Sequence, residues 1–226
     1  AVSLAAGAQH TCAVLATGAV RCWGNGADGR LGYGNTTSIG AAEAEDVSVG
    51  GAVVQVAAGA RHTCVLLTTG DVRCWGAGVD GRLGGKATTT IGDDELPSTV
   101  SIVKVSGEPT RLVAGPTHTC VLQTDGNVKC WGTGAGGRLG YANTANVGDN
   151  EFPADAGDVF AMGAVTQVSV GDFHTCVIGD AHQVRCFGTN SNGELGYGNT
   201  EPIGDDEPAL VAGDVEVGGP VIQLAA

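Results

Sequence analysis

The stretch "GAQHTCAVLATGAVRCWGNGADGRLG", residues 7–32, decides the fold, because the chain repeats it. The second copy occupies residues 59–84, the third 115–140, and the fourth and most altered 171–196. Its His-Thr-Cys begins at His10, His62, His118 and His174, with spacings of 52, 56 and 56 residues. Self-similarity at a nearly fixed period indicates an array of identical supersecondary units rather than one conventional domain.

The repeat divides the chain into units 2–53, 54–109, 110–165 and 166–221, and 222–226 begins a fifth, because "VIQLAA" matches "AVSLAA" at the start. Short strands rich in Val, Leu, Cys and Thr are expected in the first unit at 3–6, 11–15, 19–23 and, more weakly, 46–49. Four-stranded antiparallel units at a period near 50 predict an all-β chain of β-propeller blades.

The recurring blocks "HTC-x-L", "G-x-V-R-C-W-G-x-G-x-x-G-R-L-G" and "V-x-Q-x-A-A-G" resemble regulator-of-chromosome-condensation repeats, in a disulfide-bearing, secreted bacterial-type form. This resemblance covers nearly the whole chain and implies a propeller, commonly of seven blades, whose faces bind other proteins. The chain departs from the usual pattern in its paired cysteines, in a long insertion after "RLG", and in having four units.

Composition narrows the function classes. The 226 residues carry a formal charge of −13, which disfavours binding to a nucleic-acid backbone. No apolar run approaches the roughly 20 residues that span a bilayer. The first ten residues lack a basic region followed by an apolar stretch, so they do not read as a signal peptide.

Two cysteines occur in each unit, always ten residues apart and on either side of an expected hairpin turn. This symmetry predicts one disulfide within each blade, and hence an extracellular, cell-surface or periplasmic location. Free core thiols are an alternative, as is a Cys-His metal or nucleophile site, because each His lies two residues before a Cys. The predicted pairs are Cys12–Cys22, Cys64–Cys74, Cys120–Cys130 and Cys176–Cys186.

The first unit also contains "GNGADG", residues 24–29, which spells the G-x-G-x-x-G of dinucleotide-binding loops. A dinucleotide site needs one such loop between a strand and a helix, but here the motif recurs in phase and no helix pattern follows it. We expect structural turns and close approach between blades. The repeated His residues, and Trp23, Trp75, Trp131 and Phe187, are likewise expected to tie strands and pack blades together.

The insertion after "RLG" is acidic in three units. Clustered carboxylates can hold Ca²⁺, although the spacing differs from an EF-hand loop and each cluster supplies at most three side chains. The alternative is a solvated turn in which carboxylates cap backbone N–H groups. No other cofactor is indicated. The candidate calcium ligands are Asp93, Asp94, Glu95, Asp149, Glu151, Asp205, Asp206 and Glu207.

Both ends of the chain carry the sequence of the same innermost strand, which a single closed ring would not need twice. We therefore expect a section of a longer repeat protein, or subunits that join end to end. The expected assembly edges contain Val2 and Leu4 at one end and Ile222 and Leu224 at the other.

The leading functional hypothesis is a non-enzymatic, extracytoplasmic scaffold that binds a protein partner through propeller faces and acidic loops. The first alternative is a self-assembling subunit of a surface fibre or layer, joined through its terminal strands. The second is a lectin or enzyme with an unrecognised pocket, and only the odd turn at 179–183 breaks the repeat enough to suggest one.

Overall fold

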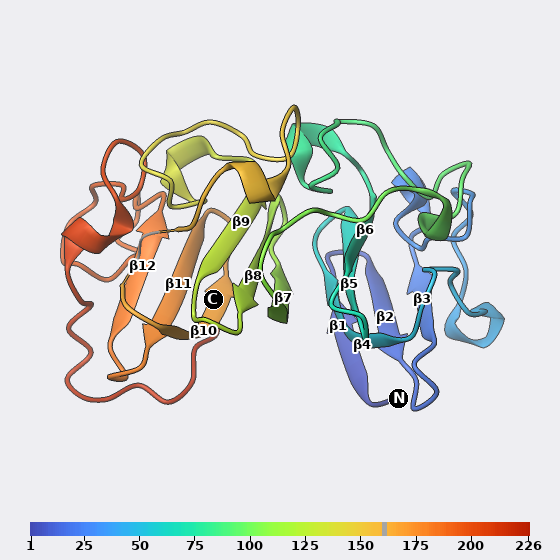
Figure 1. The fold of residues 1–226 in the computed structure, drawn as a ribbon, viewed down its shortest axis with the longest axis horizontal. Helices are drawn as coiled ribbons and strands as arrows, with labels where there is room; N and C mark the ends of the chain where they lie inside the picture. Colours follow the sequence, from blue (N-terminus) through green and yellow to red (C-terminus); the bar gives the residue numbers. More distant parts are fainter. Residues whose placement is uncertain (160–161) are drawn as a thin grey trace.

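The computed structural model describes residues 1–159 and 162–226, and its regular structure there is β-strand with short 3₁₀ turns. It contains four three-stranded antiparallel sheets, and each repeat supplies one sheet, hereafter a blade (Figure 1). The blades in chain order are β1 (Ser3–Ala6), β2 (His10–Val14), β3 (Val20–Gly24); β4 (Val53–Ala58), β5 (His62–Leu67), β6 (Val72–Gly76); β7 (Pro109–Ala114), β8 (His118–Gln123), β9 (Val128–Gly132); and β10 (Val165–Val170), β11 (His174–Gly179), β12 (Val184–Gly188).

The hairpin between the second and third strands sets the register of each blade. In blade 1 the turn closes with Gly18 N donating to Leu15 O at 2.9 Å, and Gly18 adopts a φ of +84°. Gly70 and Gly126 take the same left-handed position in blades 2 and 3, as the "TG" and "DG" sequences predict. In blade 4 the unusual turn places His182 there instead, with a φ of +64°.

The expected fourth strand of each blade is reduced to isolated contacts. Residues 46–49 form no strand, and Val47 N donates a single backbone bond, 2.8 Å long, to Val20 O. A further antiparallel bridge joins Gly24 to Ile39, and it recurs in each blade. The insertion explains the difference, because its Gly, Pro and charged residues divert the chain into 3₁₀ turns before a ladder can form. The turns of the insertion are η2 (Ala41–Glu43), η4 (Pro97–Thr99), η6 (Pro153–Asp155) and η7 (Ala209–Ala212). Three more, η1 (Ala27–Gly29), η3 (Val79–Gly81) and η5 (Ala135–Gly137), lie in the glycine-rich loop before it.

Adjacent blades share their apolar cores. The inner strands pack in succession, β1 on β4, β4 on β7 and β7 on β10, so the sheets stand side by side as propeller blades do. One buried cluster joins blade 1 to blade 2, and another runs through blades 2, 3 and 4. The repeated Leu of the Arg-Leu-Gly turn is buried in these shared clusters at Leu31, Leu83 and Leu139, as expected for a side chain that fills the gap between blades. Leu195 of blade 4 is also buried, in a separate cluster of that blade.

The two outer faces of the array differ. On blade 1, Leu4 is 64% exposed, whereas the equivalent Val56 and Val168 are 4% and 2% exposed. On blade 4, residues 222–226 lie beside β10 but form no hydrogen-bonded strand, which differs from the expected first strand of a fifth unit. Val2 and Ile222 are exposed, and Leu224 packs against the core of blade 4.

Candidate functional site

The structure contains the four disulfides that the sequence predicts. Cys12 and Cys22 face each other across β2 and β3, with their Cα atoms 4.1 Å apart, and the same pairing recurs in the other blades. No cysteine in residues 1–159 and 162–226 is free. The sulfurs are therefore committed to cross-links, and the thiolate of a metal ligand or nucleophile is not available in this state.

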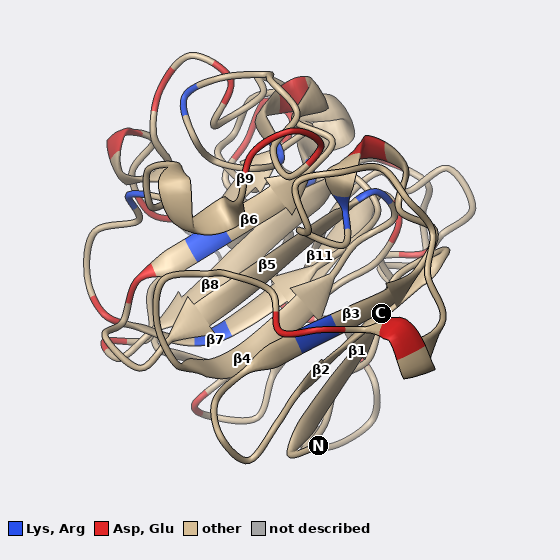
Figure 2. Ribbon diagram, turned by 90° about the vertical axis from the view of Figure 1, so that its right-hand side faces the viewer, with Lys and Arg blue, Asp and Glu red and all other residues tan. Residues whose placement is uncertain are grey.

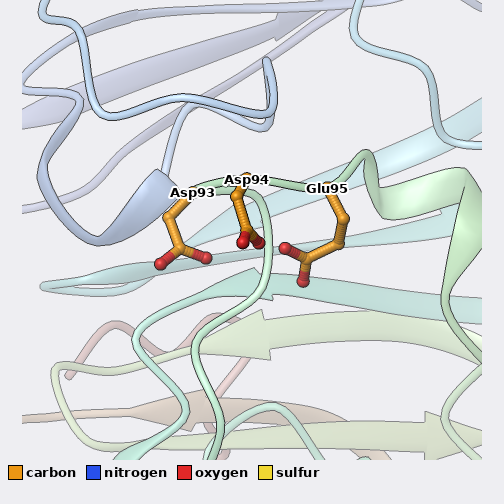
Figure 3. A group of neighbouring side chains, drawn as sticks. All are labelled: Asp93, Asp94 and Glu95. Atoms are coloured by element: carbon orange, nitrogen blue, oxygen red, sulfur yellow. The ribbon is translucent and has the colours of Figure 1, made fainter.

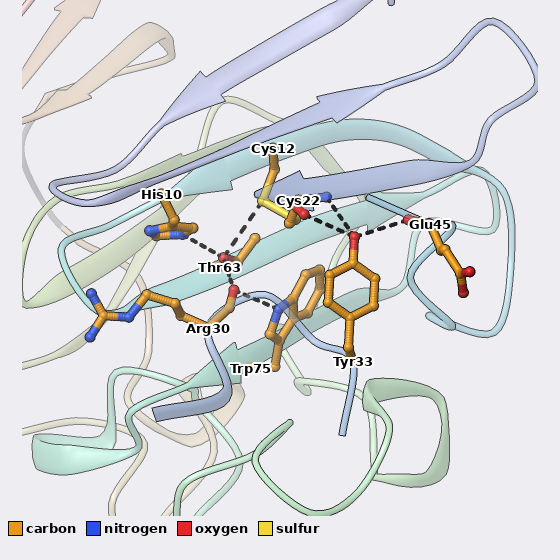
Figure 4. The surroundings of a disulfide bond; sticks show 8 residues. All are labelled: His10, Cys12, Cys22, Arg30, Tyr33, Glu45, Thr63 and Trp75. Carbon is orange, nitrogen blue, oxygen red and sulfur yellow. Dashed lines mark hydrogen bonds between the residues drawn. A yellow bond between two sulfur atoms is a disulfide. The ribbon is translucent and has the colours of Figure 1, made fainter. Parts of the chain in front are cut away.

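A polar contact joins each blade to the next (Figure 4). His10 Nε2 lies 2.8 Å from Thr63 Oγ1, and the Thr63 hydroxyl donates to Arg30 O at 2.9 Å. Trp75 Nε1 donates to the same carbonyl oxygen at 3.0 Å. The His–Thr bond recurs from His62 to Thr119 and from His118 to Thr175. The sequence predicted that these histidines tie strands together, and the partner in each case is a threonine side chain of the following blade.

This contact fixes the protonation of the histidine. Because the Thr63 hydroxyl donates to a carbonyl, its oxygen must accept the hydrogen of His10 Nε2, and His10 is the neutral tautomer protonated there. Burial, helped by the positive charge of Arg82, lowers the pKa of His62 to about 3. Burial and nearby arginines likewise lower the pKa of His118 to about 3 and that of His10 to about 4. These rings hold adjacent blades together.

We expect acid to weaken the blade junctions. Below pH 6.5 the unfolded chain protonates these histidines while the folded chain does not, so stability is lost as pH falls from 6.5 toward the folded pKa values. Each buried histidine should cost about 2 kcal/mol between pH 7 and pH 5. Denaturant unfolding of His62→Gln at both pH values should therefore show a smaller pH dependence than the parent, by about that amount.

His182 provides the control for this measurement, because its side chain is exposed. His182→Gln removes one histidine without changing a contact between blades, so its stability at the two pH values is the reference for His62→Gln. Equal pH dependence of the parent and His62→Gln would show that His62 is not buried as the neutral ring.

The glycine-rich loop holds blades together rather than a dinucleotide. In the first three blades its last three residues form a 3₁₀ turn, and no α-helix follows among the described residues. A Cβ on Gly26 would lie 2.1 Å from Thr37 O, and one on Gly29 would lie 2.2 Å from the carbonyl carbon of Gly92 in the next blade. These positions therefore need glycine for close backbone approach. In blade 4, Asn190 replaces the middle glycine and is buried, with its side chain bonded to Asn199 O and Glu201 O.

A contact that the sequence did not predict joins a tyrosine hydroxyl to the backbone of the second cysteine of a blade. The Tyr33 hydroxyl accepts a bond from Cys22 N at 3.2 Å and donates one to Cys22 O at 2.9 Å, in the position of a missing neighbouring strand. Tyr141 and Tyr197 do the same in blades 3 and 4. The signal was present, since each tyrosine follows the second cysteine of its unit by 11 residues, with Gly85 replacing it in unit two.

The acidic loops lie on the junctions between blades. Gly92 and Gly148 begin two of these loops and press against Gly29 and Gly81 of the preceding blade. The glutamate that follows has a local role in two loops, because Glu151 and Glu207 accept bonds from Gly148 N and Gly204 N. Glu151 and Glu207 thus cap backbone N–H groups, which is the alternative to calcium binding that the sequence offered. Figure 2 shows acidic residues gathered on such loops and turns rather than on the strands.

Two of the three predicted calcium clusters bring their carboxylates together. Asp93, Asp94 and Glu95 each place an oxygen within 4.8 Å of the others, and they project from one loop (Figure 3). Partial burial and a hydrogen bond with Asp94 raise the pKa of Glu95. Asp205, Asp206 and Glu207 form the equivalent cluster in blade 4, whereas Asn150 interrupts the third, between Asp149 and Glu151. Calcium binding stays a prediction, since a shared proton also relieves the repulsion.

A variable turn precedes the second strand of each blade, on the same side as the acidic loops. It carries a different residue each time, directly before the repeated histidine: Gln9, Arg61, Thr117 and Phe173. Arg61 forms a bidentate contact with Asp28 of blade 1, and Phe173 is 50% exposed beneath the guanidinium of Arg138. A recess of about 610 Å³ opens where the four turns meet, and Phe173 and Glu194 lie at its wall.

The comparisons with known proteins identify the repeat. The family model "Regulator of chromosome condensation (RCC1) repeat" matches residues 1–30, 53–82, 110–137 and 165–194, and a second model of the same description matches 125–178. The chain belongs to the RCC1 repeat family. The resemblance found in the sequence is thus confirmed, and each RCC1 match begins at or near an inner strand and ends in the glycine-rich loop.

Among RCC1-repeat relatives, the chain is 31% identical to human HERC6, described as a probable E3 ubiquitin-protein ligase, over 86% of the chain and 19% of that protein. It is 30% identical to the ultraviolet-B receptor UVR8 of Arabidopsis thaliana over 88% of the chain and 44% of the receptor. The chain thus spans less than half the length of these relatives.

Solved structures confirm the propeller arrangement. Human WBSCR16 matches with a TM-score of 0.77 and 21% identity, over 99% of this chain and 55% of that one. Yeast RCC1 (Prp20), solved bound to Kap60, matches with a TM-score of 0.72 and 18% identity, over 96% of this chain and 48% of that one. The four RCC1 blades are therefore similar to about half of each propeller.

Within the described residues, no helix has the length and apolar character needed to cross a membrane.

Proposed function

We propose that this chain is a non-enzymatic, extracytoplasmic RCC1-repeat scaffold that binds a protein partner through the face carrying the variable turns and acidic loops. The main observation behind the proposal is that recurring and variable residues of the repeat occupy different places in the structure. The recurring His, Thr, Arg and Trp groups are used in contacts between blades. Of the residues that vary before the histidine, Gln9, Arg61 and Phe173 are exposed. Recognition residues are typically placed on loops held by such a scaffold.

Three further observations support the proposal. The disulfide in every blade suits an oxidising compartment. The formal charge of −13 and the acidic loops favour a partner with a basic surface. Among the relatives, yeast Prp20p has been solved bound to Kap60, and a second structure concerns its binding to Gsp1p and histones.

The proposal is tested by identifying a secreted or surface protein that binds the purified chain and measuring its affinity for two variants. Phe173→Ala should weaken binding at least about tenfold, because an exposed aromatic at the edge of a recess is a typical interface anchor. Thr124→Ala alters the turn between β8 and β9, at the opposite ends of the strands, and should leave the affinity unchanged. Equal affinities of the two variants and the parent would contradict binding through this face.

A further inference from the structure

A recess of about 470 Å³ lies at the junction of blades 1 and 2. The insertion of blade 1 forms most of its wall, Leu96 of blade 2 forms the rest, and neither end of the chain contributes to it. Its larger apolar side chains are Tyr33, Ile39 and Leu96, and Leu96 is 39% exposed. The recess is therefore an apolar hollow at a junction that this chain forms by itself.

Three carboxylates line the same recess, namely those of Glu43, Glu45 and Asp46. Asp46 pairs with Arg21 at 2.7 Å, and Glu43 accepts a bond from Gly40 N at 2.9 Å. The Glu45 carboxylate has no hydrogen-bond or ion-pair partner among the residues that the structure describes, although its backbone oxygen lies 3.0 Å from the hydroxyl of the tyrosine in the wall (Figure 4). The apolar hollow thus carries a net negative charge, and one of its carboxylates has no role in the fold.

The equivalent place between blades 2 and 3 is covered by lysines of the chain itself. The Nζ atoms of Lys86 and Lys104 lie over the Phe152 ring, 5.8 and 4.6 Å from its centre. Phe152 corresponds to Leu96, because each directly precedes the proline that begins the 3₁₀ turn of its insertion. An ammonium group is attracted to an aromatic face, and its apolar stem covers the surface beneath it. This junction shows which kind of side chain fits there.

Both lysines are replaced at the junction of blades 1 and 2. Ser48 takes the place of Lys104, because the backbone oxygen of each accepts the N–H of the equivalent residue in the next blade. Gly34 takes the place of Lys86, two residues after the glycine of Arg-Leu-Gly. Leu96 is therefore left exposed, with acidic side chains around it instead of basic ones.

We propose that this recess binds a lysine side chain of the partner protein, with its stem on Leu96 and Tyr33 and its ammonium group paired with Glu45. A lysine fits both parts of the recess, whereas a hydrated metal ion would gain nothing from the apolar part. The formal charge of −13 favours the approach of such a basic segment. The inference rests on the function proposed above and names one contact of that partner.

Titration of the chain with the peptide acetyl-Gly-Lys-Lys-Gly-amide, followed by ¹H–¹⁵N NMR, tests the proposal. The largest chemical-shift changes should fall on residues 33–48 and on Leu96, and they should saturate in the millimolar range. The neutral peptide acetyl-Gly-Gln-Gln-Gly-amide should cause no such changes. The spectrum of each variant also shows whether it is folded.

Two pairs of variants separate the recess from the general acidity of the chain. Glu45→Gln should weaken peptide binding about threefold, as expected for one exposed ion pair. Glu108→Gln changes the net charge equally at an exposed position outside the recess and should leave binding unchanged. Ser48→Lys should weaken binding at least about tenfold, because the new side chain covers the recess as Lys104 covers its own junction. Ser48→Gln loses the same hydrogen bond to Ser98 and should bind like the parent.

Several outcomes would overturn the proposal: no shift changes, changes of equal size with the neutral peptide, or the largest changes in the acidic loops 93–95 or 205–207. Equal weakening by Glu45→Gln and Glu108→Gln, or equal binding by Ser48→Lys and Ser48→Gln, would also overturn it. The test of the proposed function uses the partner protein and Phe173, which lies outside this recess, so either result can fail without the other.

Discussion

Replacing Trp131 by alanine is expected to lower the free energy of unfolding by about 3–5 kcal/mol. The indole is fully buried between blades 2 and 3, and its Nε1 donates to Arg82 O at 3.0 Å. The substitution leaves both a cavity and an unpaired buried carbonyl. Denaturant unfolding monitored by circular dichroism measures the loss.

Two matched variants show whether this effect comes from the junction between blades. Trp23→Ala changes the same position of blade 1, where the ring is only partly buried, and should cost on the order of 1 kcal/mol. Trp131→Phe introduces phenylalanine, the residue that occupies this position in blade 4 as Phe187. It should lower the free energy of unfolding by about 1 kcal/mol, because the indole hydrogen bond is lost. Equal losses for Trp23→Ala and Trp131→Ala would contradict the packing of each blade on the one before it.

Removing one disulfide, by changing Cys120 and Cys130 together to alanine, is expected to lower the free energy of unfolding by about 3 kcal/mol. The cross-link closes a loop of ten residues, and its loss frees the unfolded chain more than the folded one. The measurement is denaturant unfolding without reductant. The same change at Cys12 and Cys22 should cost a similar amount, because that loop has the same length.

The disulfide prediction would be contradicted if the variant with both Cys120 and Cys130 changed to alanine had the same free energy of unfolding as the parent. In that case the two sulfurs would not be bonded in the purified protein, and the oxidising location proposed for the chain would lose its main support.

The sequence predicted the features that repeat within a blade. The ten-residue cysteine spacing and the hairpin glycine set the register of the second and third strands, so the pairing of Cys12 with Cys22 follows from local geometry. The glycine loops and buried leucines were also predictable, because their phase is the same in all units. Local patterns of this kind depend on neighbouring residues in the chain.

Contacts between blades could not be derived in the same way. The partner of His10 is Thr63, 53 residues later, and no local pattern says which side chain of the next blade faces it. The prediction of a fourth strand at residues 46–49 was wrong. It rested on the β-propensity of these residues and did not take into account that the preceding insertion diverts the chain. Tyr33 was missed because it lies inside that insertion, where the fold was not predicted.

Non-reducing peptide mapping by mass spectrometry tests the central claim most directly, namely that the chain is one small sheet repeated in each unit. The account predicts four linked peptide pairs, each joining a cysteine to the one ten residues after it and none joining two blades. Linkage between cysteines of different repeats, or free thiols in most molecules, would contradict it.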